Sequence, residues 1–121
     1  VVRAMAGVIA SDIHPLNNTR VVRRLADLGV APEAVTDWIQ GWIRDGFDAL
    51  EPMIEKHGGA FAFGDSPTLA DCCLVPQVYS ARRYSLDLSP WPALTAAADL
   101  AARHDAFFSA HPDNQPDAKP T

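Results

Sequence analysis

The chain has 121 residues, of which 48% are hydrophobic, and this is enough for one domain with its own core. The formal net charge at pH 7 is −5 and no basic tract occurs, which argues against nucleic acid as a partner. No apolar run reaches the ~18 residues of a membrane span. The start does not fit a signal peptide, because its apolar run is short and Asp12 follows. We therefore expect a cytoplasmic protein with no membrane partner.

Two stretches with helical spacing flank a proline near the start of the chain. Apolar residues recur at near-helical intervals over residues 1–13 and again over residues 18–28. Pro15 lies between them, cannot donate a backbone hydrogen bond, and disfavours the helical conformation at His14. We predict a kink there, after which the helix resumes and ends at Gly29 as its C-terminal cap.

The longest amphipathic helix is predicted over residues 32–57. Pro32 suits the first helical position, Pro52 is expected to bend the last turns, and two glycines stop the helix at 58–59. Its apolar side chains, three or four residues apart, are Val35, Trp38, Ile39, Trp42, Ile43, Phe47, Leu50 and Ile54. We interpret the two tryptophans as part of a core or interface stripe rather than as a ligand site.

A helix over residues 68–83 is predicted at the centre of the fold. Thr68 and Asp71 form a reciprocal capping box, with Asp where Glu or Gln is usual. Asp71 also suits the positive end of the helix dipole. The helix is apolar on nearly every side, which predicts burial. Cys72 and Cys73 point about 100° apart on a helix, so we read them as small buried hydrophobes in a reducing compartment, not as a disulfide.

The last part of the chain predicts two shorter helices, over residues 92–103 and 105–110. The segment 111–121 holds three prolines and is predicted to be an extended, partly disordered tail. The fold class is therefore all-α, with five or six helices and no sheet, and the helical domain spans residues 1–110. The four histidines are far apart and show no metal-ligand spacing, so no metal site is predicted.

Several stretches resemble one known family. Residues 63–71, FGDSPTLAD, are similar to the capping-box segment of the all-helical C-terminal domain of glutathione transferases. Residues 13–18 (IHPLNN), residues 71–83 (DCCLVPQVYSARR) and the tail pieces 110–112 and 115–117 resemble the zeta class, the maleylacetoacetate and maleylpyruvate isomerases. The likeness extends over essentially the whole chain in the same order. It implies the helical bundle of a glutathione-transferase C-terminal domain.

The resemblance also implies a domain that these residues do not contain. The family has an N-terminal thioredoxin-like domain with a serine-rich glutathione motif, and nothing here resembles that motif. The chain starts at Val1 within a helical pattern, which we take as a sign of a longer protein. The serine that activates the glutathione thiol is expected in the missing domain. We expect no catalytic residue in this chain, no activity from it alone, and a homodimer as the family's usual assembly.

The implied reaction is the cis–trans isomerisation of a maleyl to a fumaryl group, in the catabolism of aromatic amino acids or aromatic acids. Glutathione thiolate adds to the double bond, the resulting single bond rotates, and the thiolate leaves, so glutathione is a nucleophilic catalyst. The substrate is a small maleyl dicarboxylate. Its carboxylate and the developing enolate need cationic partners.

Arg20 and Arg83 are the candidates for binding the substrate, because guanidinium binds a carboxylate through two hydrogen bonds. The resemblance matches Arg83 to the substrate-side arginine of the family and implies that Arg82 points elsewhere. The alternative is that both candidates are ordinary exposed arginines.

His14, Asn18, Thr19 and Arg20 match the family segment that borders the glutathione site. On a continuous helix, His14 and Asn18 would share a face because they are four residues apart. We expect hydrogen bonding to glutathione rather than proton transfer by His14. In the alternative interpretation, His14 caps the kink, and Asn18 donates a hydrogen bond to a backbone carbonyl that Pro15 leaves without a donor.

Two other functions stay open at this point. One is a zeta-type glutathione transferase that conjugates or dehalogenates small haloacids. The other is a non-catalytic helical interaction module of the same fold, which the absent thiol domain motivates.

Overall fold

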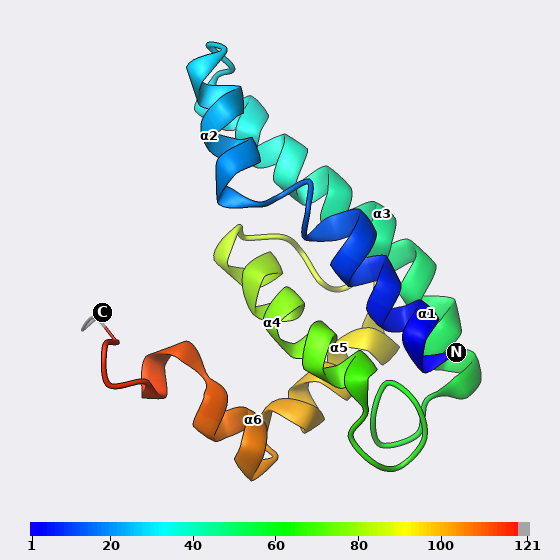
Figure 1. Cartoon of the computed structure of the whole chain (residues 1–121). Coiled ribbons are helices and arrows are strands. Elements are labelled where there is room, and N and C mark those ends of the chain that lie inside the picture. The colour runs from blue at the N-terminus through cyan, green and yellow to red at the C-terminus, as the bar shows by residue number, and fades with distance from the viewer. Residues whose placement is uncertain (119–121) are drawn as a thin grey trace.

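A computed structural model describes residues 1–118 as a bundle of helices (Figure 1). The described residues form no strand, only an isolated bridge between Gly58 and Gly64, so the all-α prediction is confirmed. Six helices are α-helical, as the pattern predicted, and two short ones are a π-helix and a 3-10 helix. The elements are α1 (Val2–Gly7), η1 (Val8–Ile13, π), α2 (Thr19–Asp27), α3 (Pro32–His57), α4 (Leu69–Arg83), α5 (Pro92–Ala102), α6 (Asp105–Ala110) and η2 (Pro112–Asn114, 3-10).

Two long helices organise the packing. Helix α4 packs against α1 and α5, and α3 packs against η1, α5 and α2. Buried apolar side chains from α1, η1, α3, α4 and α5 meet in one core, in which Phe47 of α3 and Leu74 of α4 are almost fully enclosed. Gly46 lets η1 approach α3 closely, because a Cβ at this position would overlap the Ile13 side chain. Helix α2 has no fully buried residue and lies beside the first turns of α3 (Figure 1).

The prediction of a kink at Pro15 is wrong, because the first helix ends before this residue. Its last residues form the π-helix η1, whose final backbone bond runs from His14 N–H to Ile9 O at 2.9 Å. A turn over residues 14–18 follows. Asn18 then caps a new helix, since its Oδ1 accepts the Arg20 N–H at 3.1 Å. A helix is broken here because proline removes a donor and the asparagine side chain offers the backbone a competing acceptor.

Helix boundaries elsewhere follow the predicted signals. Helix α3 spans 32–57, and α2 ends before Gly29, whose φ of 81° is the left-handed conformation of a C-terminal cap. Both halves of the capping box of α4 are present. The Asp71 carboxylate is fully buried and accepts from Thr68 N–H at 2.8 Å, Thr68 Oγ1 at 3.1 Å and Ala62 N–H at 2.9 Å. Asp71 therefore fixes both the helix and the loop before it.

The predicted burial of α4 on nearly every side is wrong for its outer face. Leu74, Val78 and Ala81 point into the core, whereas Leu69 is 55% exposed. Cys72 is also exposed and Cys73 is half-buried, so the prediction of two buried cysteines is wrong for Cys72. Both thiols are free, and burial together with the neighbouring Cys72 raises the pKa of Cys73. Hydrophobicity around a helix cannot show which apolar faces find a partner within the chain.

Helix α5 begins with a cap supplied by another helix. Its own N-cap residue, Trp91, has no side-chain capping bond. Glu51 of α3 is 8% exposed, and its two carboxylate oxygens accept the N–H groups of Ala93 and Leu94, each at 2.8 Å. One turn earlier, Asp48 accepts the indole N–H of Trp91 at 2.8 Å. These bonds fix the start of α5 against the middle of α3.

The tail is not extended throughout, which corrects the prediction for residues 111–118. Pro112–Asn114 form a 3-10 turn, and the Gln115 amide donates to Ser109 O at 2.8 Å and to His111 O at 3.0 Å. Proline at the first position of the turn favours this local structure. The last three residues of the predicted tail, 119–121, lie outside the described residues. Within residues 1–118, no helix is long and apolar enough to cross a membrane.

Candidate functional site

The turn over residues 14–18, which carries part of the predicted glutathione site, is held by α3. The indole N–H of Trp38 donates to Leu16 O at 3.0 Å, and the Asn17 amide donates to Ile39 O at 3.1 Å. Both bonds join segments 22 residues apart in sequence. The His14 side chain is exposed and makes no hydrogen bond within the described part of the chain. The turn is therefore held by hydrogen bonds to α3, while the His14 side chain stays accessible to a ligand.

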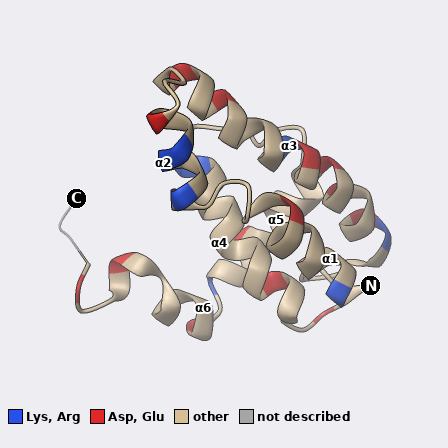
Figure 2. Cartoon of the chain, turned by 45° about the horizontal axis from the view of Figure 1, so that its top comes forward, with Lys and Arg blue, Asp and Glu red and all other residues tan. Residues whose placement is uncertain are grey.

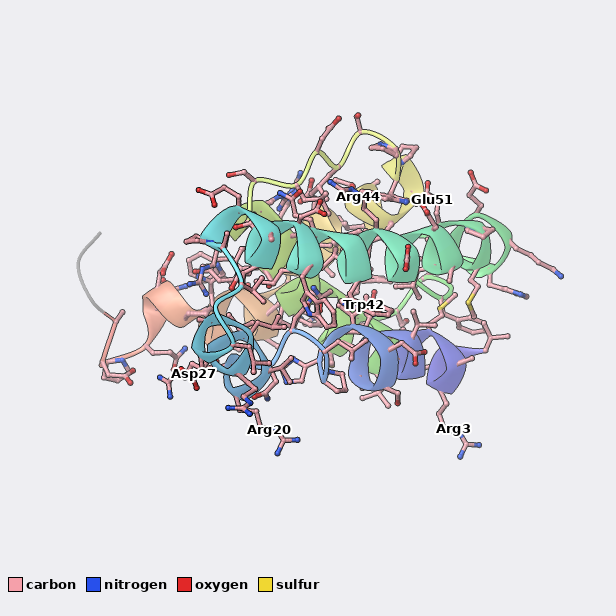
Figure 3. All side chains as sticks on the ribbon, turned by 90° about the horizontal axis from the view of Figure 1, so that it is seen from above. Arg3, Arg20, Asp27, Trp42, Arg44 and Glu51 are labelled. Atoms are coloured by element: carbon pink, nitrogen blue, oxygen red, sulfur yellow. The ribbon has the colours of Figure 1, made fainter. Side chains whose placement is uncertain are left out.

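Asn18, Thr19 and Arg20 form the start of α2. Asn18 has a structural role as the helix cap, and it does not share a helical face with His14 because the helix is broken between them. Thr19 and Arg20 are exposed, and the Arg20 side chain points away from α3 (Figure 3). Lys and Arg residues gather on α2, where Arg23 and Arg24 follow Arg20, whereas Asp and Glu residues recur along α3 (Figure 2). The start of α2 is thus suited to an anionic ligand.

The two arginines at the end of α4 have different surroundings. Arg82 donates to Asp99 of α5 at 2.8 Å, with both side chains about half exposed. Among residues 1–118, Arg83 has neither a hydrogen-bond partner nor an ion-pair partner for its side chain. Its guanidinium carbon lies 5.9 Å from the ring centroid of Tyr79, within cation–π range. Only Arg83 of this pair is therefore available to a carboxylate ligand.

The end of α4 and the 14–18 turn are attached to the same turn of α3. The Gln40 amide donates to Tyr84 O, directly after Arg83, at 2.7 Å. Trp38 and Ile39, the two residues before Gln40, hold the 14–18 turn. In Figure 1 the blue 14–18 turn and the yellow-green end of α4 lie at the same end of the bundle. The fold thus brings the predicted glutathione-side segment and the end of α4 to one region, although Arg20 and Arg83 are 63 positions apart in sequence.

A separate apolar groove lies between the outer face of α4 and α6. Its volume is about 600 Å³. It is lined by Pro67, Thr68, Leu69, Cys72, Val75, Pro76, Tyr79, His104, Ala106, Phe107, Ala110, His111 and Pro112. None of the five candidate residues of the binding site lines it. Tyr79 connects the two regions, because its ring faces Arg83 on one side and meets the His111 ring edge-on at 5.1 Å on the other.

The polar groups around the 14–18 turn are donors that suit a carboxylate or peptide ligand. They include the Thr19 hydroxyl, the Arg20 guanidinium and the His14 imidazole, all exposed. A buried acceptor, Oδ1 of Asn17, has no partner within residues 1–118. In contrast, the described residues contain no group of three or more His, Cys, Asp or Glu side chains that could hold a metal ion.

Comparison with known proteins gives the family. Residues 32–107 match the family described as "Glutathione S-transferase, C-terminal domain", and the chain belongs to this family. A maleylpyruvate isomerase from Ralstonia sp is 45% identical over 120 residues, which are 97% of this chain and 57% of the relative. The chain thus spans little more than half the length of this curated relative.

Solved structures show the same likeness. A holo maleyl pyruvate isomerase, described as a bacterial zeta-class glutathione-S-transferase, matches with a TM-score of 0.93 and 45% identity over 98% of this chain and 57% of that one. A maleylacetoacetate isomerase from Anaeromyxobacter dehalogenans 2CP-1, with GSH bound in its active site, matches with a TM-score of 0.91 and 43% identity. That match covers 98% of this chain and 54% of the other.

Sequence patterns did not indicate the roles of Asn17 and Gln40. The helical spacing predicts Trp38 in an apolar stripe but gives no partner for its indole N–H. The N–H of a buried tryptophan usually finds a hydrogen-bond partner, and this is the sequence signal for the bond to Leu16 O. Gln40 had no signal at all, since its partner is a backbone carbonyl 44 residues away.

Proposed function

We propose that this chain is the substrate-side half of a glutathione-dependent maleylacetoacetate or maleylpyruvate cis–trans isomerase. The observation that carries the proposal is the contrast at the end of α4. Arg82 is paired with Asp99, whereas the Arg83 side chain has no hydrogen-bond or ion-pair partner within residues 1–118. The end of α4, where Arg83 stands, lies at the same end of the bundle as the donor-rich turn at 14–18 (Figure 1). The similarity to isomerases over nearly the whole chain supports the same reading.

In this proposal each candidate residue binds or orients a ligand. Arg83 binds a substrate carboxylate through both guanidinium nitrogens, and Arg20 adds positive charge where negative charge develops. His14, Asn18 and Thr19 hydrogen-bond the peptide or carboxylates of glutathione, with Asn18 contributing whatever capacity its capping bond leaves. Glutathione, when bound, supplies the thiolate that adds to the double bond and leaves again. The group that holds this thiol ionised is assigned to the other half of the protein.

We further propose that a thioredoxin-like half covers the apolar groove between α4 and α6. In the lining described above, Leu69 and Cys72 are exposed and Phe107 is half-buried, and burying such a surface is favourable. Residues 1–110 act as the helical domain of the complete protein, and residues 111–121 as a tail. The finer assignments follow the family: a cytoplasmic homodimer in the catabolism of aromatic compounds. The free thiols of Cys72 and Cys73 agree with a reducing compartment.

The proposal is tested by assaying this chain and a version extended to the length of its relatives. Both are given maleylacetoacetate and maleylpyruvate, with and without glutathione, and chloroacetic acids serve as competing substrates. We expect glutathione-dependent isomerisation by the extended protein only. Turnover of the chlorinated acids without isomerisation would favour the haloacid transferase. Inactivity of the extended protein towards every substrate would favour an interaction module.

A further inference from the structure

We infer that one turn of α3 positions the two binding segments separately. In this inference Trp38 is a positioning residue for the 14–18 turn, and Gln40 is a positioning residue for Arg83. It rests on the proposed function, because it deepens the assignment of those two segments to glutathione and to the dicarboxylate. Neither side chain is proposed to touch a ligand.

The Trp38 arm is built from two hydrogen bonds that use different groups of α3. The Trp38 indole reaches Leu16 O at 3.0 Å, and the Ile39 carbonyl accepts from the Asn17 side chain at 3.1 Å. Both contacts are partly buried, where the loss of a hydrogen bond costs more than at an exposed site. Within the turn the Asn17 N–H donates to Ile13 O at 3.2 Å and to His14 O at 3.3 Å, so the two bonds to α3 are the ones that fix the turn against the bundle. His14 and Asn18 are at its two ends.

The Gln40 arm holds the C-terminal end of α4. Here the backbone closes with bonds from Ser85 N–H to Arg82 O at 2.9 Å and from Leu86 N–H to Ala81 O at 3.0 Å. This closure places Ser85 at a φ of 54°, a left-handed conformation that is strained for a non-glycine residue. The Gln40 amide satisfies the free carbonyl of Tyr84 at 2.7 Å. A helix end with a strained residue is stabilised by a hydrogen bond from another helix, and Gln40 of α3 donates this bond directly after Arg83.

Neighbouring side chains on α3 offer matched controls. Trp42 packs edge-on against Trp38 with ring centroids 5.7 Å apart, and no hydrogen bond of its indole is found within residues 1–118. Arg44 donates to the other end of the Gln40 amide at 2.9 Å and is exposed. Figure 3 shows Trp42 on the side of α3 that faces the first helices and Arg44 on the opposite side. Trp42→Phe and Arg44→Met leave the bonds from Trp38 to Leu16 O and from Gln40 to Tyr84 O in place, and Arg44→Met removes only the bond to the opposite end of the Gln40 amide.

The experiment uses the extended protein with the substitutions Trp38→Phe, Gln40→Met, Trp42→Phe and Arg44→Met. Dissociation constants are measured by calorimetry for glutathione and, separately, for maleate as a dicarboxylate probe. Backbone hydrogen exchange is followed in residues 14–18 and 84–86. These readouts do not require turnover. Melting temperatures of the four variants show whether any variant is unfolded.

We expect Trp38→Phe to raise the dissociation constant for glutathione by about tenfold, as the loss of one net hydrogen bond would. The dissociation constant for maleate should change by less than about twofold. Exchange should accelerate in residues 14–18 only. Gln40→Met should have the opposite pattern. Maleate should bind more weakly, the dissociation constant for glutathione should stay unchanged, and hydrogen exchange should accelerate in residues 84–86 only. The Trp42→Phe and Arg44→Met controls should change neither constant beyond about twofold.

Changes in both constants by the same factor, or faster exchange in both segments at once, would overturn the inference and leave the proposed function standing if isomerisation is observed. The separate responses without any isomerisation would support the positioning roles and contradict the proposed reaction. If the extended protein binds neither ligand, the proposed function fails, and the exchange pattern alone decides whether the two arms act separately.

Discussion

Glu51 offers the most quantitative test of how the bundle is held together. Replacing it with glutamine keeps the shape of the side chain but turns one acceptor oxygen into a donor. That donor would face the N–H of Ala93 or Leu94, each of which now lies 2.8 Å from a carboxylate oxygen. The substitution also removes a negative charge from the start of α5, where the helix dipole favours it.

The expected cost follows from these two losses. A hydrogen bond to a buried charged group contributes roughly 1.5–3 kcal/mol, and the dipole interaction adds about 0.5–1 kcal/mol. Glu51→Gln should therefore lower the free energy of unfolding by about 3 kcal/mol. With a urea slope of about 2 kcal/mol/M, the midpoint falls by roughly 1.5 M. Urea denaturation followed by far-UV circular dichroism measures this shift.

The matched control is Glu55→Gln, one turn later on the same helix, where the side chain is exposed. It should change the free energy of unfolding by less than about 0.5 kcal/mol. Equal effects of the two substitutions would refute the assignment of Glu51 as the cap of α5. The comparison of Glu51→Gln with Glu55→Gln isolates the contribution of the buried carboxylate.

Three further substitutions or reactions test other features. Asp71→Asn should destabilise the fold by about 2 kcal/mol in urea, because one of its oxygens becomes a donor facing backbone N–H groups. Ser85→Gly should raise stability by about 0.5 kcal/mol, since relief of the left-handed strain exceeds the added chain entropy. In single-cysteine variants, iodoacetamide should react faster with Cys72 than with Cys73 near pH 7, because burial, the larger cause of the raised pKa of Cys73, remains without Cys72 and leaves less thiolate. The difference between the alkylation rates of the two cysteines should become smaller as the pH rises, because more of Cys73 is then ionised.

Each of these predictions has a result that would contradict it. An unchanged urea midpoint for Asp71→Asn would mean that the buried carboxylate is not needed as the acceptor for the loop and the helix start. A gain from Ser85→Ala as large as that from glycine would rule out backbone strain as the cause. Equal alkylation rates of the two cysteines at pH 7 would contradict their different surroundings.

Local sequence signals predicted most of the helices. The bounds of α3 followed from Pro32 and the glycines at 58–59, and the start of α4 from the capping box, because these signals act within one turn of the chain. At the break after Ile13, the helical pattern predicts a kink, whereas the helix ends there. Proline alone is compatible with either outcome, and the deciding bonds, from Asn18 and from α3, are not visible in a helical pattern.

Contacts between distant residues could not be predicted in this way. Glu51 caps α5 from 42 and 43 residues away, and Gln40 reaches Tyr84 from 44 residues away. The exposed outer face of α4 shows a related limit, because apolar residues do not specify what covers them. The candidate site residues came from resemblance to a family. Geometry adds that Arg82 and Arg83 differ in pairing, which two adjacent arginines in a sequence cannot reveal.

The most direct test of the central claim compares Arg83→Gln with Arg82→Gln in the extended protein. The measurement is kcat/KM for glutathione-dependent isomerisation of maleylpyruvate and maleylacetoacetate. If Arg83 binds the substrate carboxylate, its substitution should lower kcat/KM by about 100-fold, in line with the loss of a charge-stabilising donor. Arg82→Gln, which breaks only the exposed pair with Asp99, should lower it by less than about threefold. Equal, small effects of both substitutions would contradict the assignment of this chain as the substrate-binding half.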